Sequence, residues 1–337
     1  MSKLIEVTAG SCVYMGNAEA MLQQLLPSKR VIVISDTNID RIYHDLISKY
    51  DTILIGQGEQ AKGLTTLDEI YRRLIELGAD RSTFILGIGG GIVTDVTGFV
   101  ASTYMRGVEF GFVTTTLLGA VDASVGGKNG INIGGFKNMV GLFSQPRFVV
   151  CDVELLHSLP TREFRAGMAE VIKSAILGDA ELFKALEQSS FEELHEDSQL
   201  LENLVARCIQ IKASVVDEDE RESGRRRILN LGHTLAHAIE KCSKKMSHGE
   251  AVAVGLYHIT LFALAQKSID ESEGKRILSL IERYGFETAL PVDKKQLRKA
   301  MQGDKKRQGD SLHIIIPTAI GAVEDSVVAY NELKNVF

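Results

Sequence analysis

Long apolar runs and cysteines are both scarce in the sequence. Its longest apolar stretch, residues 251–265, contains His258 and is shorter than the roughly 20 residues of a transmembrane helix, so we expect a buried helix of a soluble protein there. The cysteines at positions 12, 151, 208 and 242 lie far apart and form no C-x-x-C pair. This spacing gives no support to a disulfide framework or a thiolate zinc site.

An excess of basic charge is also absent. Lys and Arg number 38 against 44 Asp and Glu, for a net charge of −6. Nucleic-acid-binding proteins usually carry a basic face, so we expect no nucleic-acid partner. The first residues lack the charged segment and apolar core of a signal peptide, so we expect no membrane partner and a cytoplasmic protein. Basic residues cluster locally at 225–227 and 305–307, and such clusters can bind an anionic small molecule.

The chain has no internal repeat, and its two halves differ in periodicity. In the first half, β-branched runs alternate with helical spacing, which predicts a parallel sheet of crossover units. The second half has long stretches of helical spacing. We predict an α/β domain over residues 1–150 and a mainly α-helical domain over residues 151–337. The expected strands are residues 31–35, 52–56, 84–90 and 110–115, and the expected helices are residues 64–77, 163–177, 200–215, 234–242, 250–266 and 275–284.

A glycine cluster over residues 87–91 follows one predicted strand and precedes a helical run. Backbone N–H groups and a helix N-terminus in this setting can receive a pyrophosphate. The spacing is not G-x-G-x-x-G, and a tight strand-to-helix turn would need small residues as well. Asp36 and Asn38 follow the first buried strand, where such side chains can reach an adenosine ribose.

Glu170, His233 and His248 supply the two nitrogens and one carboxylate that hold a catalytic zinc with one coordination position open. Lys173 lies three residues after Glu170, so amine and carboxylate could share one pocket. His237 lies four residues after His233, but the glutamate of H-E-x-x-H is missing, which disfavours a protease. Any single histidine is more often a core or capping side chain; as a set, these favour a metal site.

Motifs along the chain resemble those of the sugar phosphate cyclase family, and among its members those of the 3-dehydroquinate synthases. The resemblance covers almost the whole chain, and the motifs follow the order of the family. They are GEQAK (58–62), GGGIVTDVTGFVASTYMRGV (89–108), TTLLGAVDASVGGK (115–128), KNMVG (137–141), AEVIK (169–173), DERESG (219–224), NLGHTLAHAIE (230–240) and HGEAVAVG (248–255).

The resemblance implies a homodimer with an N-terminal Rossmann-like NAD-binding α/β domain, a helical C-terminal domain and an active site in the cleft between them. It implies NAD and one divalent metal, zinc or cobalt, held by Glu170, His233 and His248. The positions that match catalytic residues of the family are Lys128, Asn138, Lys173, Lys212, Arg226, Asn230 and His237. Those that match substrate contacts are Asp122, Arg106 from the partner subunit, and one of Lys305 and Lys306. Those that match NAD contacts are Asp36, Asn38, Glu59, Lys62, Gly89, Gly90, Gly91, Asp95, Thr115, Thr116 and Lys137.

The implied reaction converts a phosphorylated sugar acid, 3-deoxy-arabino-heptulosonate 7-phosphate, to 3-dehydroquinate and phosphate. Transient oxidation by NAD acidifies a neighbouring proton, phosphate is eliminated, hydride returns, the ring opens and an aldol step closes the carbocycle. The sequence departs from the common pattern of the family at three places: Thr94 replaces a frequent glycine, Thr114 replaces proline in V-P-T-T-L-L, and Asn129 with Gly130 gives GGKNGIN in place of GGKTAIN. None of these changes removes a charged or metal-binding group.

Three alternatives stay open. Another sugar phosphate cyclase would use a different sugar phosphate in the same cycle. A metal-dependent polyol dehydrogenase of the same fold would release NADH. A non-catalytic binding protein is disfavoured because the metal and lysine sets are intact.

Overall fold

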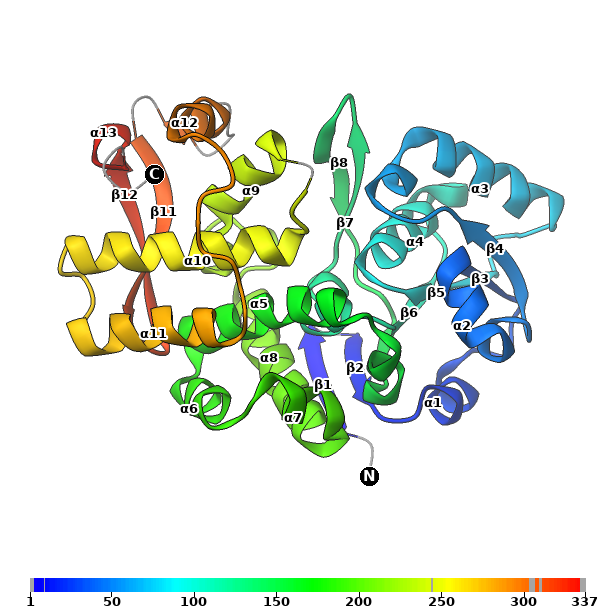
Figure 1. Ribbon diagram of the computed structural model, residues 1–337. Coiled ribbons are helices and arrows are strands. Elements are labelled where there is room, and N and C mark those ends of the chain that lie inside the picture. Colours follow the sequence, from blue (N-terminus) through cyan, green and yellow to red (C-terminus); the bar gives the residue numbers. More distant parts are fainter. Residues whose placement is uncertain (1–2, 9, 244, 303–306, 309–310, 334–337) are drawn as a thin grey trace. The chain divides into compact units, whose positions relative to one another are not determined.

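The computed structural model describes residues 3–8, 10–243, 245–302, 307–308 and 311–333 (Figure 1). By its internal contacts the chain divides into two compact units. Unit 1 comprises Met1–Pro160 and Leu201–Arg221, and unit 2 comprises Thr161–Leu200 and Glu222–Phe337. The sequence places residues 151–337 in a single domain, whereas in the structure the segment Leu201–Arg221 groups with unit 1.

A seven-stranded sheet forms the centre of unit 1. Its strands are β1 (Lys3–Thr8), β2 (Ser11–Met15), β3 (Val31–Asp36), β4 (Asp51–Ile55), β5 (Phe84–Gly89), β6 (Phe110–Thr114) and β9 (Phe148–Cys151). Their order is β1-β2-β9-β6-β5-β3-β4, with β1 antiparallel to β2 and all other pairs parallel. The predicted Rossmann-like parallel sheet is therefore confirmed, and each of the four predicted strands is present.

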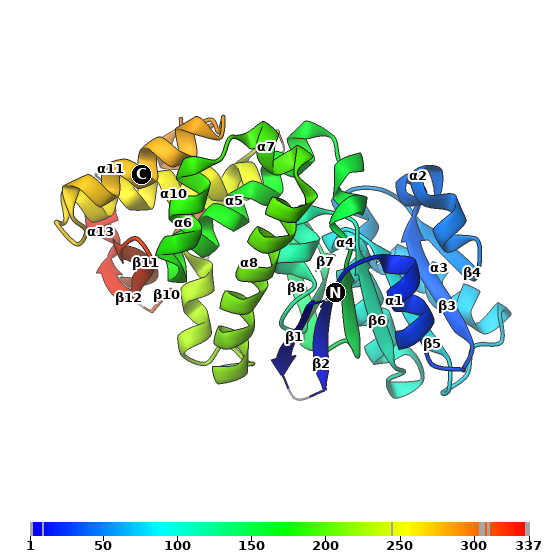
Figure 2. The same cartoon turned by 90° about the horizontal axis from the view of Figure 1, so that it is seen from below.

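Helices cover both faces of this sheet (Figure 2). They are α1 (Ala18–Leu25), α2 (Thr37–Ile47), α3 (Leu64–Glu76) and α4 (Gly91–Thr103). Side chains alternate between the faces of a strand. Leu86 of β5 packs in one core with residues of α1 and α2. Gly87 points the other way, because a Cβ there would lie 2.8 Å from Oγ1 of Thr97 in α4.

A two-stranded hairpin and several short helices complete the connections of unit 1. They are β7 (Lys128–Ile133), β8 (Phe136–Phe143), η1 (Glu59–Lys62), η2 (Tyr104–Arg106), the π-helix η3 (Gly119–Ala123) and η4 (Val153–Ser158). The long helix α8 (Ser198–Glu218) belongs to unit 1 through all but its first residues. Lys212 of α8 bonds to Asp122 of η3: its Nζ donates to the carbonyl oxygen and to Oδ1 of Asp122, each at 2.7 Å.

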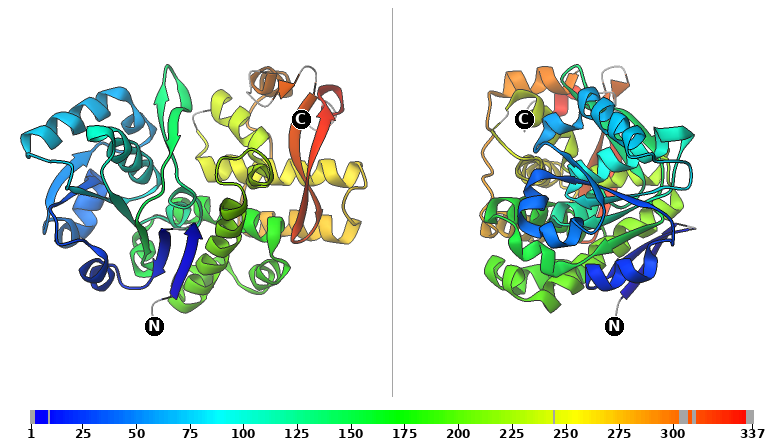
Figure 3. Two further views of the ribbon diagram at one scale, coloured as in Figure 1. Left: turned by 180° about the vertical axis from the view of Figure 1, so that it is seen from behind. Right: turned by 90° about the vertical axis from the view of Figure 1, so that its right-hand side faces the viewer.

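Unit 2 is mainly helical, as predicted. Its elements are α5 (Thr161–Gly178), α6 (Ala180–Gln188), α7 (Phe191–Glu196), η5 (Arg225–Asn230), α9 (His233–Cys242), α10 (His248–Ala265), α11 (Glu271–Arg283), α12 (Lys294–Gln302), β10 (Arg307–Gln308), β11 (Ser311–Ala319), β12 (Ala322–Ala329) and α13 (Tyr330–Leu333). The sequence did not predict the antiparallel sheet β10-β11-β12. Figure 3 shows β11 and β12 beside α10, and β11 contacts that helix.

Helix α10 is the core helix of unit 2. Among the described residues it is long and apolar enough, by length and composition alone, to cross a membrane, but 61% of it is buried within the protein. It packs against α5, α9, α11 and β11, and the expected buried helix is confirmed. Two glycines permit the close approach. A Cβ at Gly249 would clash with the carbonyl oxygen of Ala166 in α5, and one at Gly255 with that of Gly232 before α9.

Candidate metal centre and nucleotide-binding loop

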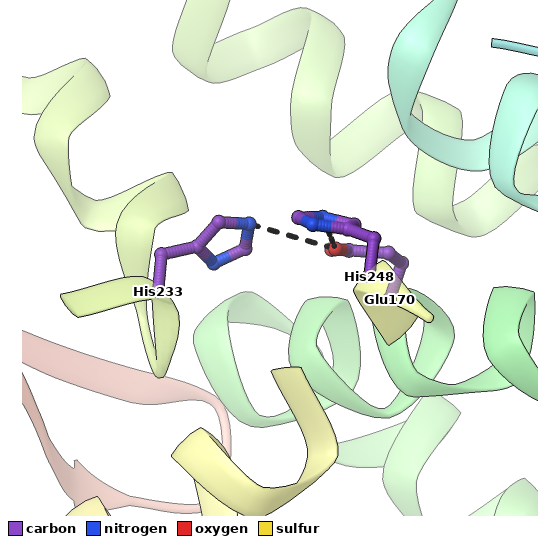
Figure 4. A group of neighbouring side chains, drawn as sticks. All are labelled: Glu170, His233 and His248. Atoms are coloured by element: carbon purple, nitrogen blue, oxygen red, sulfur yellow. Dashed lines mark ion pairs between the residues drawn. The ribbon is translucent and has the colours of Figure 1, made fainter. Parts of the chain in front are cut away.

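Glu170, His233 and His248 come together in unit 2 (Figure 4). Glu170 lies within α5, whereas His233 and His248 are the first residues of α9 and α10. Oε1 of Glu170 is 3.6 Å from Nε2 of His233 and 3.3 Å from Nε2 of His248. One ligand atom from each residue lies within 4.8 Å of the other two. Two imidazole nitrogens and a carboxylate oxygen suit zinc or cobalt and leave room for a further ligand.

The first turn of α10 fixes the position of His248. Ser247 caps the helix, its Oγ accepting from the backbone N–H of Glu250, while the Glu250 carboxylate accepts from the backbone N–H of Ser247 at 2.7 Å. The same carboxylate accepts two bonds of 2.8 Å from Arg162 of α5. The capping box fixes the first turn of α10, and the bonds from Arg162 tie that turn to the beginning of α5.

The electrostatic surroundings of the two histidines differ. Burial, together with the positive charge of Lys173, holds the pKa of His233 well below its usual value. Burial also lowers the pKa of His248, but the carboxylates of Glu170 and Glu240 outweigh burial and raise it to about 10. The two carboxylates therefore create a negative potential at His248. A bound divalent cation would be stabilised by the same field.

Two predicted pocket residues contact this triad, and two others lie on η5. Nζ of Lys173 is 2.5 Å from Oε2 of Glu170, which confirms that amine and carboxylate share one pocket. The ring of His237 stands nearly perpendicular to that of His233, with centroids 5.5 Å apart. Arg226 is 1% exposed in η5. At the end of η5, Asn230 donates from Nδ2 to Oε1 of Glu222 at 2.5 Å.

The glycine cluster of unit 1 joins β5 to α4. Gly89 ends the strand, Gly90 is the N-cap, and Gly91 begins the helix. A Cβ at Gly89 would lie 2.5 Å from Val93, and one at Gly90 would lie 2.8 Å from Thr116. Close packing therefore accounts for these glycines by itself. No side chain of the described residues caps α4, so the N–H groups of its first turn are available to a phosphate.

A buried lysine of η1 connects helix α4 to strand β8. Nζ of Lys62 is 2.5 Å from Oδ2 of Asp95 in α4 and donates to Oδ1 of Asn138 in β8 at 2.7 Å. Burial raises the pKa of Asp95, and Lys62 opposes that shift. Close by in the sequence, Glu59 accepts from Nδ2 of Asn132 at 2.7 Å and lies 3.4 Å from Nζ of Lys137.

Asp36 ends β3 and Asn38 lies in the first turn of α2, so both stand at the carboxyl end of that strand, as predicted. Oδ1 of Asp36 accepts from the backbone N–H groups of Asn38 and Ile39 and so caps α2. Oδ1 of Asn38 accepts from Arg41 at 2.8 Å. Both side chains therefore have structural roles in addition to any contact with a ribose.

The remaining predicted site residues differ in their surroundings. Asp122 binds Lys212, while Lys128 is exposed. Arg106 is exposed with a φ of 70°, in the left-handed region. Thr115 and Thr116 directly follow β6, and the backbone N–H of Thr115 donates to the carbonyl of Gly89. The predicted substrate contacts Lys305 and Lys306 lie outside the described residues.

The three departures from the family pattern have local structural roles. Thr94 is buried and donates from Oγ1 to the carbonyl of Gly91 at 3.0 Å. Thr114 is fully buried at the end of β6. Asn129 is buried and donates to the carbonyl of Ser144 at 2.9 Å. Their polar groups are thus satisfied by the backbone.

Two residues of these sites were missed in the sequence. Oε1 of Glu240 lies 3.5 Å from Nδ1 of His248, and Asn132 bonds Glu59. For Glu240 a signal exists, because it follows His233 by seven residues, two helical turns on the same face. Asn132 carries no such signal, since its partner is 73 positions away.

Comparison with solved structures identifies the fold as that of the sugar phosphate cyclases. The crystal structure of 2-deoxy-scyllo-inosose synthase complexed with carbaglucose-6-phosphate, NAD+ and Co2+ is 26% identical, with a TM-score of 0.88, covering 100% of this chain and 99% of that one. The structure of 2-epi-5-epi-valiolone synthase from Streptomyces hygroscopicus subsp. jinggangensis, with NAD+ and Zn2+ bound, is also 26% identical, with a TM-score of 0.87 and coverage of 100% and 97%.

Sequence comparison identifies the family within this class. The family model for the N-terminal part of 3-dehydroquinate synthase matches residues 52–166, and the model for its C-terminal part matches residues 167–307. The 3-dehydroquinate synthase of Leptospira interrogans is 40% identical over 322 residues, which are 91% of this chain and 89% of that protein. The chain belongs to the 3-dehydroquinate synthase family.

Proposed function

We propose that this protein is a 3-dehydroquinate synthase, a phosphate-eliminating carbon–oxygen lyase of the shikimate pathway and so of aromatic amino acid biosynthesis. Its substrate is 3-deoxy-arabino-heptulosonate 7-phosphate, and its products are 3-dehydroquinate and phosphate. The observation that carries the proposal is the convergence of Glu170, His233 and His248 beside Lys173, in a chain 40% identical to a relative of that name.

The protein uses NAD and one zinc or cobalt ion. Glu170, His233 and His248 hold the metal, and the turn from Gly89 to Gly91 receives the pyrophosphate at the start of α4. When bound, NAD would supply reversible hydride transfer and the metal would act as a Lewis acid on a substrate hydroxyl. Lys62, Asp95 and Glu59 line the nucleotide side of the site, with Lys137 and Asn138 on the neighbouring hairpin.

Residues of the chain bind the two anionic ends of the substrate. Lys173 and Arg226 are buried cations of unit 2, and Lys212 is a buried cation of unit 1. Burial strengthens their attraction for a phosphate or carboxylate, since water screens it less. Lys128 and Asn230 complete the polar contacts.

His237 moves the proton of the oxidised hydroxyl. Its ring lies one helical turn from His233, with centroids 5.5 Å apart, so it reaches a hydroxyl held near the metal ligands. The departing phosphate takes the proton next to the new ketone, because the carboxylates beside the triad among the described residues of unit 2 already have other roles. Glu170 is a metal ligand, and Glu240 faces His248.

The active protein is a cytoplasmic homodimer in which Arg106 of the partner subunit binds the substrate phosphate. The support is local: Arg106 is exposed, and both it and Met105 adopt the left-handed backbone region, at φ of 70° and 49°. Such a conformation is costly for non-glycine residues and is typical of functional loops.

The test is an assay of phosphate release with metal-reconstituted protein, NAD and a panel of sugar phosphates. We expect release from the heptulosonate phosphate, formation of 3-dehydroquinate, no net rise in nicotinamide absorbance, and loss of turnover with a chelator. Net accumulation of NADH would instead identify a polyol dehydrogenase, and release of phosphate from none of the panel would identify a binding protein.

Another sugar phosphate cyclase activity is the second candidate. It is favoured by the TM-score of 0.88 to 2-deoxy-scyllo-inosose synthase, although identity is only 26%. Glucose 6-phosphate and heptulose 7-phosphate in the panel separate the two proposals. Preference for either of them over the heptulosonate phosphate would establish the second.

A further inference from the structure

The two histidines of the triad are both held from their Nδ1 side. Nδ1 of His233 is 3.1 Å from the carbonyl oxygen of Leu231. Nδ1 of His248 is 3.5 Å from Oε1 of Glu240. Each ring therefore presents its other nitrogen, Nε2, to Glu170. The two acceptors differ in charge, because one is a neutral carbonyl and the other a carboxylate.

Glu240 is a residue of α9 whose buried side chain faces His248. Its side chain is only 7% exposed, and removing a carboxylate from water is costly unless it is paired. Helices α9 and α10 pack side by side, so a residue near the end of α9 reaches the first residue of α10. His233, His237 and Glu240 follow one another at spacings of four and three, on one face of α9.

Metal-binding histidines commonly donate their second ring N–H to a carboxylate or carbonyl, and this bond fixes the tautomer and strengthens the metal-binding nitrogen. We propose that Glu240 is a positioning residue of the metal centre. It accepts from Nδ1–H of His248 and so keeps the lone pair on Nε2, directed at the point shared with Glu170 and His233. The inference rests on the proposed function only for the presence of a divalent metal and is independent of the substrate.

The experiment measures metal affinity directly. Metal-free wild type and the variants Glu240→Gln and Glu240→Asp are titrated with zinc against a chromophoric chelator, and with cobalt by visible absorption. Glu240→Gln keeps an acceptor but loses the charge, so we expect zinc binding about 10- to 100-fold weaker and an altered cobalt spectrum. Glu240→Asp should recover part of the affinity, because it restores the charge.

Glu187→Gln is the matched control. It also neutralises one glutamate of unit 2, paired there with Arg276 of α11, and should leave zinc affinity and the cobalt spectrum unchanged. Melting of the metal-free proteins separates positioning from a purely structural role, which would lower the melting temperature without changing metal affinity. Should Glu240→Gln not fold, the affinity and cobalt spectrum of Glu240→Asp decide.

The proposal is overturned if the folded Glu240 variants bind zinc like wild type with an unchanged cobalt spectrum, if Glu187→Gln weakens binding equally, or if wild type binds no zinc. A wild type that binds zinc but releases no phosphate from the heptulosonate would refute the proposed function alone. The comparison of Glu240 variants would then still stand.

Discussion

Nζ of Lys173 lies 2.5 Å from Oε2 of Glu170, one turn away on α5, and the two side chains are only 3% and 1% exposed. The other oxygen of the carboxylate, Oε1, faces Nε2 of His233 and of His248. One carboxylate thus joins a buried lysine to the metal ligands. A buried carboxylate needs a positive partner, and here both the lysine and a bound metal supply positive charge.

Lys173→Met should test whether the lysine and a bound metal together neutralise the buried carboxylate of Glu170. Without metal, the variant leaves the buried Glu170 carboxylate with less positive charge, so the free energy of unfolding should fall by about 3 kcal/mol. Bound zinc should restore part of the loss. Urea unfolding with and without a chelator measures both values. An equal loss under the two conditions would contradict the idea, and phosphate release should fall strongly in either case.

Gly249→Ala should disturb the metal centre through packing alone. A Cβ there clashes with the carbonyl oxygen of Ala166, so α10 must move away from α5 and carry His248 from Glu170. We expect a loss of about 1–3 kcal/mol in stability together with weaker zinc binding. Gly56→Ala is the control, because a Cβ at that position would have no atom within 4 Å. Unchanged zinc affinity in Gly249→Ala would count against this packing role.

Lys62→Met should weaken NAD binding and leave zinc binding unaffected. The ammonium bridges Asp95 and Asn138, and a charge-assisted hydrogen bond is worth about 1.5–3 kcal/mol, so we expect roughly a tenfold or greater rise in the NAD dissociation constant. Quenching of nucleotide fluorescence provides the affinity, and the chelator titration provides the control. A variant with wild-type NAD affinity would place the nucleotide elsewhere.

Glu187 and Arg276 should make stability depend on pH. Two hydrogen bonds of 2.8 and 2.7 Å from Arg276 hold the pKa of Glu187 below its usual value. A lowered folded-state pKa stabilises the protein above the unfolded-state pKa, and this contribution disappears as pH falls through the folded-state pKa. Glu187→Gln should therefore cost about 1 kcal/mol at neutral pH and almost nothing in strong acid.

Urea unfolding of wild type and Glu187→Gln, from neutral pH to strong acid, measures the difference in the free energy of unfolding between them. Glu271→Gln provides a comparison, because Glu271 and Lys275 form an exposed pair on one helix, whose loss should cost at most about 0.5 kcal/mol. A difference between wild type and Glu187→Gln that persists undiminished in acid would contradict the assignment.

Local pattern was sufficient to predict the strands β3, β4, β5 and β6 and six of the helices. The β-branched runs at residues 31–35 and 84–90 form β3 and β5 because burial on both faces of a parallel sheet requires continuous apolar residues. The spacing of Glu170 and Lys173 predicted one shared pocket, since residues three apart lie on one side of a helix. In both cases the residues lie a few positions apart in one strand or helix, so backbone geometry alone sets which of them share a face.

By itself, then, the sequence determined four strands of the central sheet, six of the helices, the order of motifs and the chemical types of the ligands. Only the tertiary structure decided that α5, α9 and α10 bring the three ligands together, that α8 joins unit 1, and that Glu240 stands behind His248. Periodicity reports which face of a helix is buried, but not the partner that buries it. That choice depends on contacts between distant segments, such as Gly249 against Ala166.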